Sequence, residues 1–500
     1  MQYSKIAFAC GLALSAMAAQ AAGPTIPAGT VTIYLSGASA PDNFLNDTVK
    51  DMLTNEVAIR GSSANSYRAF LGQATANIPG VTAGTNILLI KRSKGGSVWG
   101  VDPLARAQRI ETLDFNNCTA LTPTASDPYS WNCAVKGNDP GTSGYVNSVA
   151  NAGLIPDFGV SDVEPKMFKS PLNTENGLPQ LTSTELARLT ASPVNQIMMG
   201  IVATDAVAAT THISRSQYGA MLAGAYDTWE QIDGSADPVV VCRRVPGSGT
   251  QTSYNWFFSG FPCNGASSDK LLPKGVADSY GYDGGHAGTA ADPIIVDPSA
   301  GYTVVENSGS GDVRNCLKAA QNGTDHTVTG SNGKVYKVTF SAVGGPSKAI
   351  GVLSLDSYPQ AAASGSGFSF RMLDGAGTFN GSTQAASAGA TGIAPSKANL
   401  VNGKYDFVVE LSMQKRNQAV NLGAEVVPAP DATKTAFFTQ LVKNLGSTKY
   451  TANDGGTFTS TPNAFASLPT VASYASKPTM VNRFTRNADT CQPFEAKPSL

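Results

Sequence analysis

Histidine and charged residues are scarce in this sequence of 500 residues. There are 3 histidines, and charged side chains make up 14% of the chain, against roughly 25% in an average soluble protein. Because histidine is the most frequent general acid–base residue and a frequent metal ligand, chemistry based on imidazole is disfavoured. We interpret His212, His286 and His326, which are scattered among polar segments, as ordinary surface residues.

An excess of basic charge is also missing. The chain has 35 basic and 36 acidic residues, for a net charge of −1, which excludes a nucleic-acid binder that depends on a basic surface. No G-x-S-x-G elbow, H-E-x-x-H helix or G-x-x-x-x-G-K-[ST] loop occurs, and no cluster of Asp and His ligands can be assembled. We therefore predict no metal, no cofactor and no enzymatic activity.

Long apolar segments are confined to the N-terminus. Lys5 is followed by the apolar run 6–19 and by the small residues of Ala19-Gln20-Ala21, which is the pattern of a secretory signal peptide cleaved after Ala21. A lipoprotein anchor at Cys10 is the alternative. We expect residues 1–21 to be removed, no membrane span in the mature chain, and a periplasmic or secreted protein.

Six cysteines remain after that cleavage, and an even number in an exported protein predicts disulfides. Spacing favours two local bridges, Cys118–Cys133 and Cys242–Cys263. The pair Cys316–Cys491 then follows by elimination only. None of the cysteines has C-x-x-C spacing, so a zinc site is disfavoured.

Short β-runs that lead through a Gly/Ser turn into a helix recur along the chain. Strands are predicted at 31–35, 86–90 and 239–241, and helices at 41–52, at 101–113 and around the aromatic stretch 254–258. This repetition predicts an α/β fold. Three polar or Gly/Ser-rich stretches, 114–150, 264–300 and 360–400, are predicted to be surface insertions.

The turns at these helix starts carry hydroxyl side chains. Ser39 follows the first strand, Ser97 follows Gly95-Gly96, and Gly247-Ser248-Gly249-Thr250 follows Arg243-Arg244. A helix N-terminus offers free N–H groups and a partial positive charge, so such turns can bind an oxyanion, and a neighbouring arginine can clamp it. The alternative for each serine is a simple helix cap.

Asp162, in the segment 157–162, is the fourth candidate. The ordinary interpretation is a turn or cap carboxylate. Among anion donors, however, a carboxylate would accept the proton of hydrogen phosphate, whereas sulfate would leave that acceptor unpaired.

Taken together, these segments resemble the periplasmic phosphate-binding proteins of the phosphate ABC transporter, which have the type 2 periplasmic binding protein fold. The similar segments, in family order, are Ser36-Gly37-Ala38-Ser39-Ala40-Pro41 (G-A-T-F-P), Asp157-Phe158-Gly159-Val160-Ser161-Asp162 (D-F-G-A-S-D), Ala223-Gly224 through Trp229 (L-G-x-x-x-x-W), Arg243-Arg244-Val245-Pro246-Gly247-Ser248-Gly249-Thr250 (R-x-D-G-S-G-T) and Ala349-Ile350-Gly351-Val352 (A-I-G-Y). Pro246 stands where the family usually has Asp, and Ala40 replaces an aromatic residue. In the second turn Ser97 is preferred as the ligand hydroxyl, with Ser93 or Lys94 as alternatives.

The resemblance implies two α/β lobes, residues 24–203 plus 407–500 and residues 204–406, joined by crossing strands at 201–203 and 407–409. It also implies that phosphate binds in the cleft between them. The implied phosphate ligands are Ser39, Ser97, Asp162, Arg244, Ser248, Gly249 and Thr250.

Three functions follow as hypotheses. The first is an exported solute-binding protein for inorganic phosphate, with an inner-membrane ABC transporter as partner. The second is an exported phosphomonoesterase on the same scaffold. The third is a secreted structural or adhesive protein with a vestigial cleft, which the low charge and the Gly/Ser/Ala insertions suggest.

Overall fold

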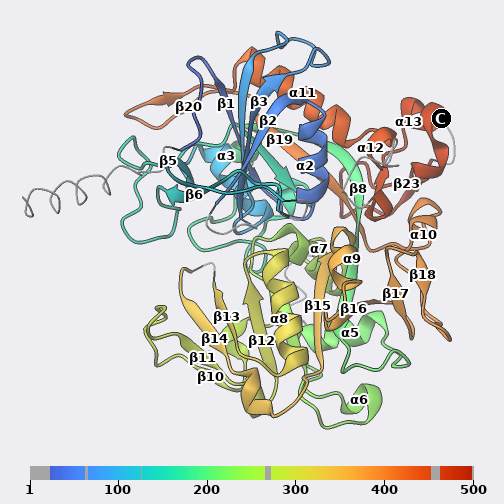
Figure 1. The fold of residues 1–500 in the computed structure, drawn as a ribbon. Coiled ribbons are helices and arrows are strands. Elements are labelled where there is room, and N and C mark those ends of the chain that lie inside the picture. Colours follow the sequence, from blue (N-terminus) through green and yellow to red (C-terminus); the bar gives the residue numbers. More distant parts are fainter. Residues whose placement is uncertain are drawn as a thin grey trace, which may run out of the picture.

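The computed structural model describes residues 23–61, 66–124, 127–264, 272–330, 332–451 and 462–497. In these ranges the chain forms two lobes (Figure 1). The long strand β8 (Leu189–Thr204) and strand β19 (Val408–Arg416) connect them. The predicted signal peptide, residues 1–21 with Cys10, lies outside the described residues.

The first lobe is built around β1 (Val31–Gly37), which is parallel to β4 (Asn86–Arg92) on one side and to β7 (Phe158–Ser161) on the other. β7 pairs antiparallel with β19. Beyond β4 the sheet continues in the order β3, β2, β6, β5. The bounds of the remaining strands are β2 (Leu53–Gly61), β3 (Tyr67–Ala74), β5 (Thr112–Ala120), β6 (Trp131–Lys136) and β22 (Phe465–Ser467), which pairs with β8.

The second lobe repeats this arrangement. Its first strand, β9 (Val240–Arg244), is parallel to β12 (Thr303–Asn307) and β15 (Ala349–Ser354), and β15 pairs antiparallel with β8. The edge strands are β16 (Phe368–Arg371), β17 (Thr378–Asn380) and β18 (Ala385–Ala386).

The order of strands is therefore the same in both lobes. Each lobe has three parallel strands, counted in chain order, and one antiparallel crossing strand. The second parallel strand, the first, the third and the crossing strand lie side by side, as β4-β1-β7-β19 in one lobe and as β12-β9-β15-β8 in the other. β8 leaves β19 and joins β15 between Met198 and Met199. This arrangement confirms the predicted two-lobed α/β fold, and the exact chain ranges of the lobes stay a prediction.

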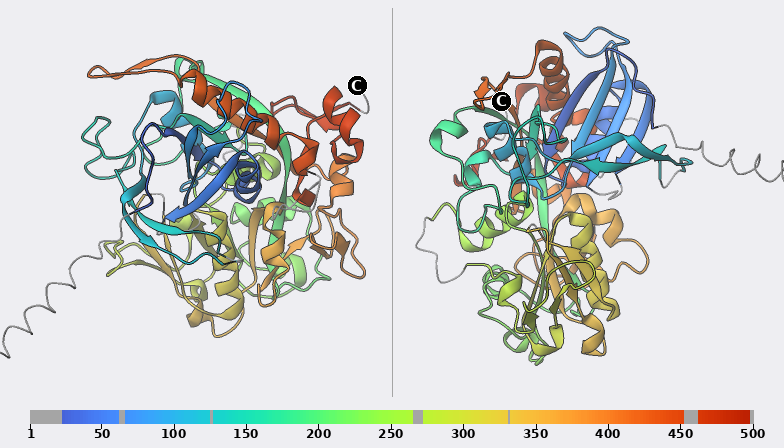
Figure 2. Two further views of the ribbon diagram at one scale, coloured as in Figure 1. Left: turned by 45° about the horizontal axis from the view of Figure 1, so that its top comes forward. Right: turned by 90° about the vertical axis from the view of Figure 1, so that its left-hand side faces the viewer.

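Helices cover the sheets and explain the apolar strand sequences, because a strand buried on both faces has no polar side (Figures 1 and 2). The helices of the described residues are α2 (Asp42–Lys50), α3 (Asp102–Arg106), α4 (Ser183–Leu186), α5 (Arg215–Leu222), α6 (Glu230–Asp233), α7 (Gly249–Ser259), α8 (Ser310–Asn322), α9 (Tyr358–Ala361), α10 (Lys397–Val401), α11 (Ala432–Leu445), α12 (Thr448–Thr451) and α13 (Val471–Ser476). None of those helices is long and apolar enough to cross a membrane.

One predicted helix is much shorter than expected. The sequence predicts a helix over 101–113, but α3 ends at Arg106. The next residue, Ala107, has a φ of 53° that takes the chain out of the helix, and β5 begins at Thr112. The apolar residues that suggested a long helix are divided between a short helix and a buried strand, which periodicity alone does not distinguish.

Two of the stretches predicted to be surface insertions contribute strands to the main sheet. The stretch 114–150 contains most of β5 and all of β6, which pair antiparallel and extend the first-lobe sheet beyond β2. The stretch 360–400 contains β16, β17 and β18, which join the sheet at β8. A separate four-stranded sheet has the order β10 (Tyr282–Asp283), β11 (Ile294–Val296), β14 (Val335–Val338) and β13 (His326–Thr329). Two hairpins lie further on, β20 (Val420–Asn421) with β21 (Val426–Val427) and β23 (Phe484–Thr485) with β24 (Glu495–Ala496).

Three disulfides are present, and one of the predicted pairs is confirmed. Cys118 and Cys133 lie opposite each other on β5 and β6 and are bonded. The other two predicted pairs, Cys242–Cys263 and Cys316–Cys491, are wrong. The bonds are Cys242–Cys316 and Cys263–Cys491.

The physical reason for the wrong pairs is that spacing does not tell which way a side chain points. Cys242 is buried in β9 and faces α8, which carries Cys316. Cys263 follows the end of α7 and meets the C-terminal segment instead.

Candidate functional site

The candidate site lies where the strands of the two lobes end. Parallel strands end at one edge of a sheet, so the residues that follow them come close together. In the first lobe β1, β4 and β7 are followed by Ser39, Ser97 and Asp162. A hydrogen bond from Thr250, at the start of α7 in the second lobe, to Asp162 brings the two edges together.

Asp162 is at the centre of the contact between the lobes. It is 2% exposed, and its Oδ2 accepts a hydrogen bond from the Thr250 hydroxyl at 3.0 Å. Its backbone N–H donates to Ser97 Oγ at 3.1 Å, which leaves the hydroxyl proton of Ser97 to donate elsewhere. The other carboxylate oxygen, Oδ1, is buried and has no hydrogen-bond partner. Burial raises the pKa of Asp162 to about 6, although the Thr250 hydroxyl and the charge of Arg244 act in the opposite direction.

Arg244 ends β9 and is 1% exposed. Its Nε donates to the carbonyl of Asn307 at 3.2 Å and its Nη2 to the carbonyl of Ser308 at 2.6 Å. Its Nη1 lies 3.4 Å from the hydroxyls of both Ser39 and Ser310. Burial lowers the pKa of Arg244, but a guanidinium stays protonated in proteins, so a buried cation faces the hydroxyls of both lobes.

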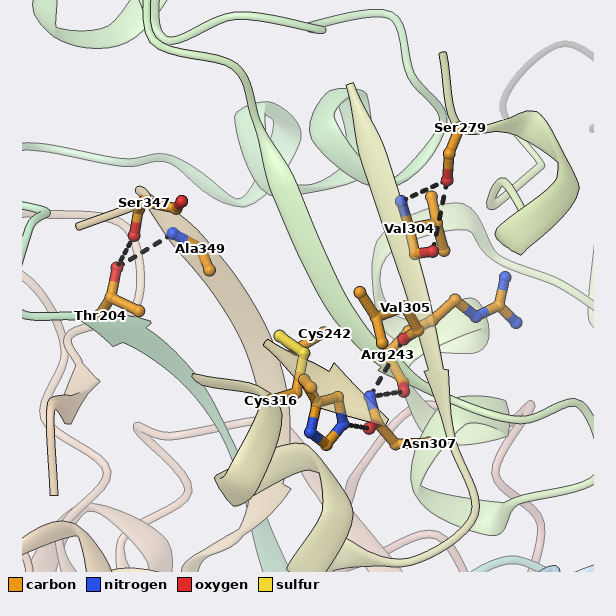
Figure 3. Close-up of a disulfide and its surroundings, with 11 residues drawn as sticks. Thr204, Cys242, Arg243, Ser279, Val304, Val305, Asn307, Cys316, Ser347 and Ala349 are labelled. Carbon is orange, nitrogen blue, oxygen red and sulfur yellow. Dashed lines mark hydrogen bonds between the residues drawn. A yellow bond between two sulfur atoms is a disulfide. The ribbon is translucent and has the colours of Figure 1, made fainter. Parts of the chain in front are cut away.

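The two carbonyls that hold Arg244 explain how Pro246 is accommodated. The family pattern places a carboxylate at that position, and here backbone oxygens of the neighbouring strand and turn orient the guanidinium instead. The disulfide Cys242–Cys316 links β9 to α8 near Asn307 (Figure 3). Asn307 strengthens the same junction, because its side-chain amide donates to the carbonyl of Arg243 at 3.0 Å.

Ser310 is a site residue that sequence reasoning missed. It is the first residue of α8, and its hydroxyl lies 3.4 Å from Ser39 Oγ as well as from Arg244. The signal was present, because Ser308-Gly309-Ser310-Gly311 follows β12 just as the other Gly/Ser turns follow their strands. The N-terminus of α8 therefore lies beside the arginine, and the N–H of Gly309, its N-cap residue, donates to Asp312 at 2.9 Å.

Ser248 and Gly249 have more specific roles than the sequence suggests. The hydroxyl of Ser248 caps α7 by accepting from the N–H of Gln251 at 3.4 Å, so its helix-cap interpretation is correct and a ligand role stays a prediction. A Cβ on Gly249 would lie 2.3 Å from Ser97 Oγ and 2.9 Å from Asp162 Cβ. Glycine at this position is what allows α7 to approach the first lobe so closely.

Of the three alternatives in the second turn, only Ser97 contacts Asp162. The Ser93 hydroxyl instead donates to Asp42, at 2.8 Å from Oδ2, and Lys94 forms ion pairs with Glu111 and Asp139.

Further contacts hold the two lobes together around the site. The backbone N–H of Val98 donates to the carbonyl of Gly247 at 2.9 Å, and Asn255 of α7 donates to Asn173 at 2.8 Å. Within the described part of the chain, no three His, Cys, Asp or Glu side chains lie close enough to hold a metal ion. The arrangement offers the guanidinium of Arg244, several hydroxyls, two helix N-termini and an unpaired acceptor, and the charge of the buried Lys91 also acts on Asp162. Together these groups suit a small protonated oxyanion.

No family model matches the sequence, and no curated protein matches it. Several solved structures are similar to it at low identity. One is described as a putative phosphate ABC transporter substrate-binding protein with bound phosphate from Clostridium perfringens (11% identity, 84% of this chain and 96% of that chain covered, TM-score 0.38). Another is an ABC-type phosphate transport receptor from Vibrio cholerae (12%, 85% and 98%, TM-score 0.36). A third is an ancestral soluble variant of the human phosphate binding protein (14%, 92% and 98%, TM-score 0.40).

Proposed function

We propose that this protein binds inorganic phosphate between its two lobes. The observation that carries the proposal is the unpaired, buried Oδ1 of Asp162 beside a buried arginine. A buried acceptor without a partner costs roughly 1–3 kcal/mol, so a ligand that supplies the missing donor is favoured. Hydrogen phosphate carries such a proton and also carries the negative charge that Arg244 requires.

The remaining ligand oxygens would be held by donors from both lobes. Ser39 and Ser97 of the first lobe and Ser310 of the second supply hydroxyls. The Thr250 hydroxyl already donates to Asp162, so Thr250 would take part through its place at the start of α7, and the starts of α7 and α8 supply N–H groups. Because the cation comes from one lobe and the proton acceptor from the other, the complete site exists only when the lobes meet. Phosphate would therefore stabilise the closed arrangement.

The test is titration calorimetry at pH 7.5 on protein stripped of bound phosphate. Phosphate is expected to bind saturably, and a large excess of sulfate is expected not to displace it. In Asp162→Asn the amide can donate to sulfate but accepts a phosphate proton poorly, so the preference for phosphate over sulfate should fall about a hundredfold. Absence of heat with phosphate would exclude this function.

The cellular role forms part of the same proposal. We infer an exported protein, cleaved after residue 21, with lobes at 24–203 plus 407–500 and at 204–406, that delivers phosphate to an inner-membrane ABC transporter. The three disulfides support an oxidising compartment. A chromogenic phosphate ester separates this role from a phosphomonoesterase, because a binding protein should release no product.

A further inference from the structure

A cavity of about 530 Å³ lies beside the proposed phosphate site. Gly95 and Ser308 separate the two, since both line the cavity while the carbonyl of Ser308 accepts from Arg244. The N–H of Gly95 lies 3.4 Å from the Ser308 hydroxyl, so the two lobes meet at this border. The volume is in the range typical of small-molecule sites, roughly 300–1,000 Å³.

Segments of both lobes enclose this cavity. One wall comes from the loop after β6, with Gly137, Asp139, Pro140 and Thr142, and the facing wall comes from β13 together with Gly330 and Gly333. Residues of the first-lobe core complete the lining, among them Tyr67 of β3 and Arg92 of β4.

Most charges on the walls are paired with each other. Arg92 pairs with Asp139 at 2.7 Å, and Lys94 pairs with Glu111 at 2.5 Å and with Asp139 at 3.0 Å. The half-buried carboxylate of Asp312 also lines the cavity, and it accepts a hydrogen bond from the N–H of Gly309 at 2.9 Å. Glu175 is buried, which raises its pKa to about 8, so at neutral pH it is mostly protonated. A strongly charged ligand would have to break these ion pairs in order to be neutralised.

The polar groups exposed in the cavity include both hydrogen-bond donors and hydrogen-bond acceptors, so a matching ligand must also carry both. Carboxylates accept only, and an ammonium group donates only. The side chain of Lys94 is 39% exposed and that of Glu111 is 21% exposed, so both can reach a ligand. The exposed Thr327 and Thr329 and the half-buried Ser308 add hydroxyls that can do either. Hydroxyl groups on a ligand satisfy all of these partners, whereas a carboxylate or a phosphate would meet further carboxylates.

We propose that this cavity binds an uncharged, hydroxyl-rich molecule of the size of a sugar. Because residues of both lobes line it, the sugar and phosphate would stabilise the same closed arrangement, and each would raise the affinity of the other by about fivefold or more. Only this coupling rests on the proposed phosphate site. The sugar site itself stands on the cavity.

Ligand-observed NMR and calorimetry on the full mature chain test the proposal. The probes are D-glucose, maltose and myo-inositol, with glucosamine and glucuronate as charged analogues, each with and without saturating phosphate. At least one uncharged probe is expected to bind, and more tightly with phosphate present. No binding of any uncharged probe at about 10 mM, or binding only of a charged analogue, would overturn the proposal.

A substitution that fills the cavity with a large side chain tests whether the sugar binds there. Thr329→Trp places a bulky side chain at an exposed position of the cavity wall, and Thr119→Trp is the matched control on an exposed position of β5 outside it. Thr329→Trp should weaken sugar binding at least tenfold and leave phosphate binding within about twofold, while the control changes neither. Equal sugar binding by both variants would overturn the assignment. Retained sugar binding with no phosphate binding in the unmodified protein would reject the proposed function alone.

Discussion

The two lobes have the same strand order, yet the carboxylates at equivalent positions differ in their hydrogen bonding. Asp162 follows the third strand of the first lobe, and Asp356 follows the third strand of the second, one residue further on. Asp356 accepts from the side chain of Asn43 at 3.0 Å, and its charge opposes the fall in the pKa of Arg314 that burial causes. Asp162 keeps one oxygen without a partner.

Hydroxyl side chains occupy equivalent positions in the two lobes, but the arginine of the site has no equivalent in the first lobe. Ser97 and Ser310 come after the second strand of their respective lobes and both face the site. The cation Arg244 comes from the second lobe alone. The comparison teaches that duplication of the strand order produces two matching edges, and that the division of cation and proton acceptor between them makes a site that needs both lobes.

The largest effect is expected from removal of the cation. Arg244→Ala should weaken phosphate binding by a factor of about 100 to 1,000, because the loss of a buried charged partner costs roughly 2–5 kcal/mol. Calorimetry measures this loss. The control is Arg106→Ala, since Arg106 pairs with Glu185 at 2.8 Å and donates to the carbonyl of Pro179 rather than to the site, and it should change affinity less than threefold. Equal losses in both variants would contradict the assigned role.

Replacement of the two carboxylates by amides should change the free energy of unfolding in opposite directions. Burial raises the pKa of Asp162 to about 6 from a usual 3.8, so ionisation of this group lowers the free energy of unfolding as pH rises from about 4 to above 6. Without phosphate, Asp162→Asn should remove that decrease and stabilise the protein by up to about 3 kcal/mol at pH 8, with no gain below pH 4.

Asp356→Asn serves as the comparison in the same urea-unfolding series. It removes a charge that lies near Arg314 and accepts from Asn43, so it should destabilise the protein at pH 8. If both variants changed the free energy of unfolding in the same direction at pH 8, the proposed difference between the two carboxylates would be wrong.

A smaller effect is expected from keeping the lobes apart. Gly249→Ala places a Cβ 2.3 Å from Ser97 Oγ, so α7 must move away from the first lobe, and phosphate affinity should fall about tenfold. Small-angle scattering with saturating phosphate should show a less compact molecule. In the control Gly345→Ala the added Cβ has no neighbour within 4 Å, and both measurements should be unchanged.

The smallest effect concerns the hydroxyl that the sequence analysis missed. Ser310→Ala should weaken phosphate binding about fivefold, in keeping with the loss of one hydrogen bond of roughly 1 kcal/mol. Ser183→Ala makes the same change at the first residue of another helix, α4, where the side chain is exposed. If Ser310→Ala behaved like this control, α8 would have no part in the site.

Much of the fold could be predicted because each strand–turn–helix unit is a local pattern. The strands that became β1, β4 and β9 and the turns after them were recognisable from short apolar runs and from glycine and serine. The turn at 308–311 has the same pattern and was overlooked. The local pair Cys118–Cys133 could be predicted from its spacing. The partners of the other four cysteines could not, since the loop closed by Cys263 and Cys491 spans 228 residues and depends on where two distant segments meet.

The sequence by itself determined which groups are available: a cation at the end of one strand, hydroxyls at helix starts, and Asp162 after a buried strand. These follow from local composition, because strand ends and helix starts form from neighbouring residues. Only the tertiary structure decided that Thr250 reaches Asp162 across the lobes while the other oxygen of that carboxylate stays unpaired, and that segments of both lobes enclose a cavity beside it. Burial and pairing are properties of groups far apart in the chain, so they arise only when the lobes meet.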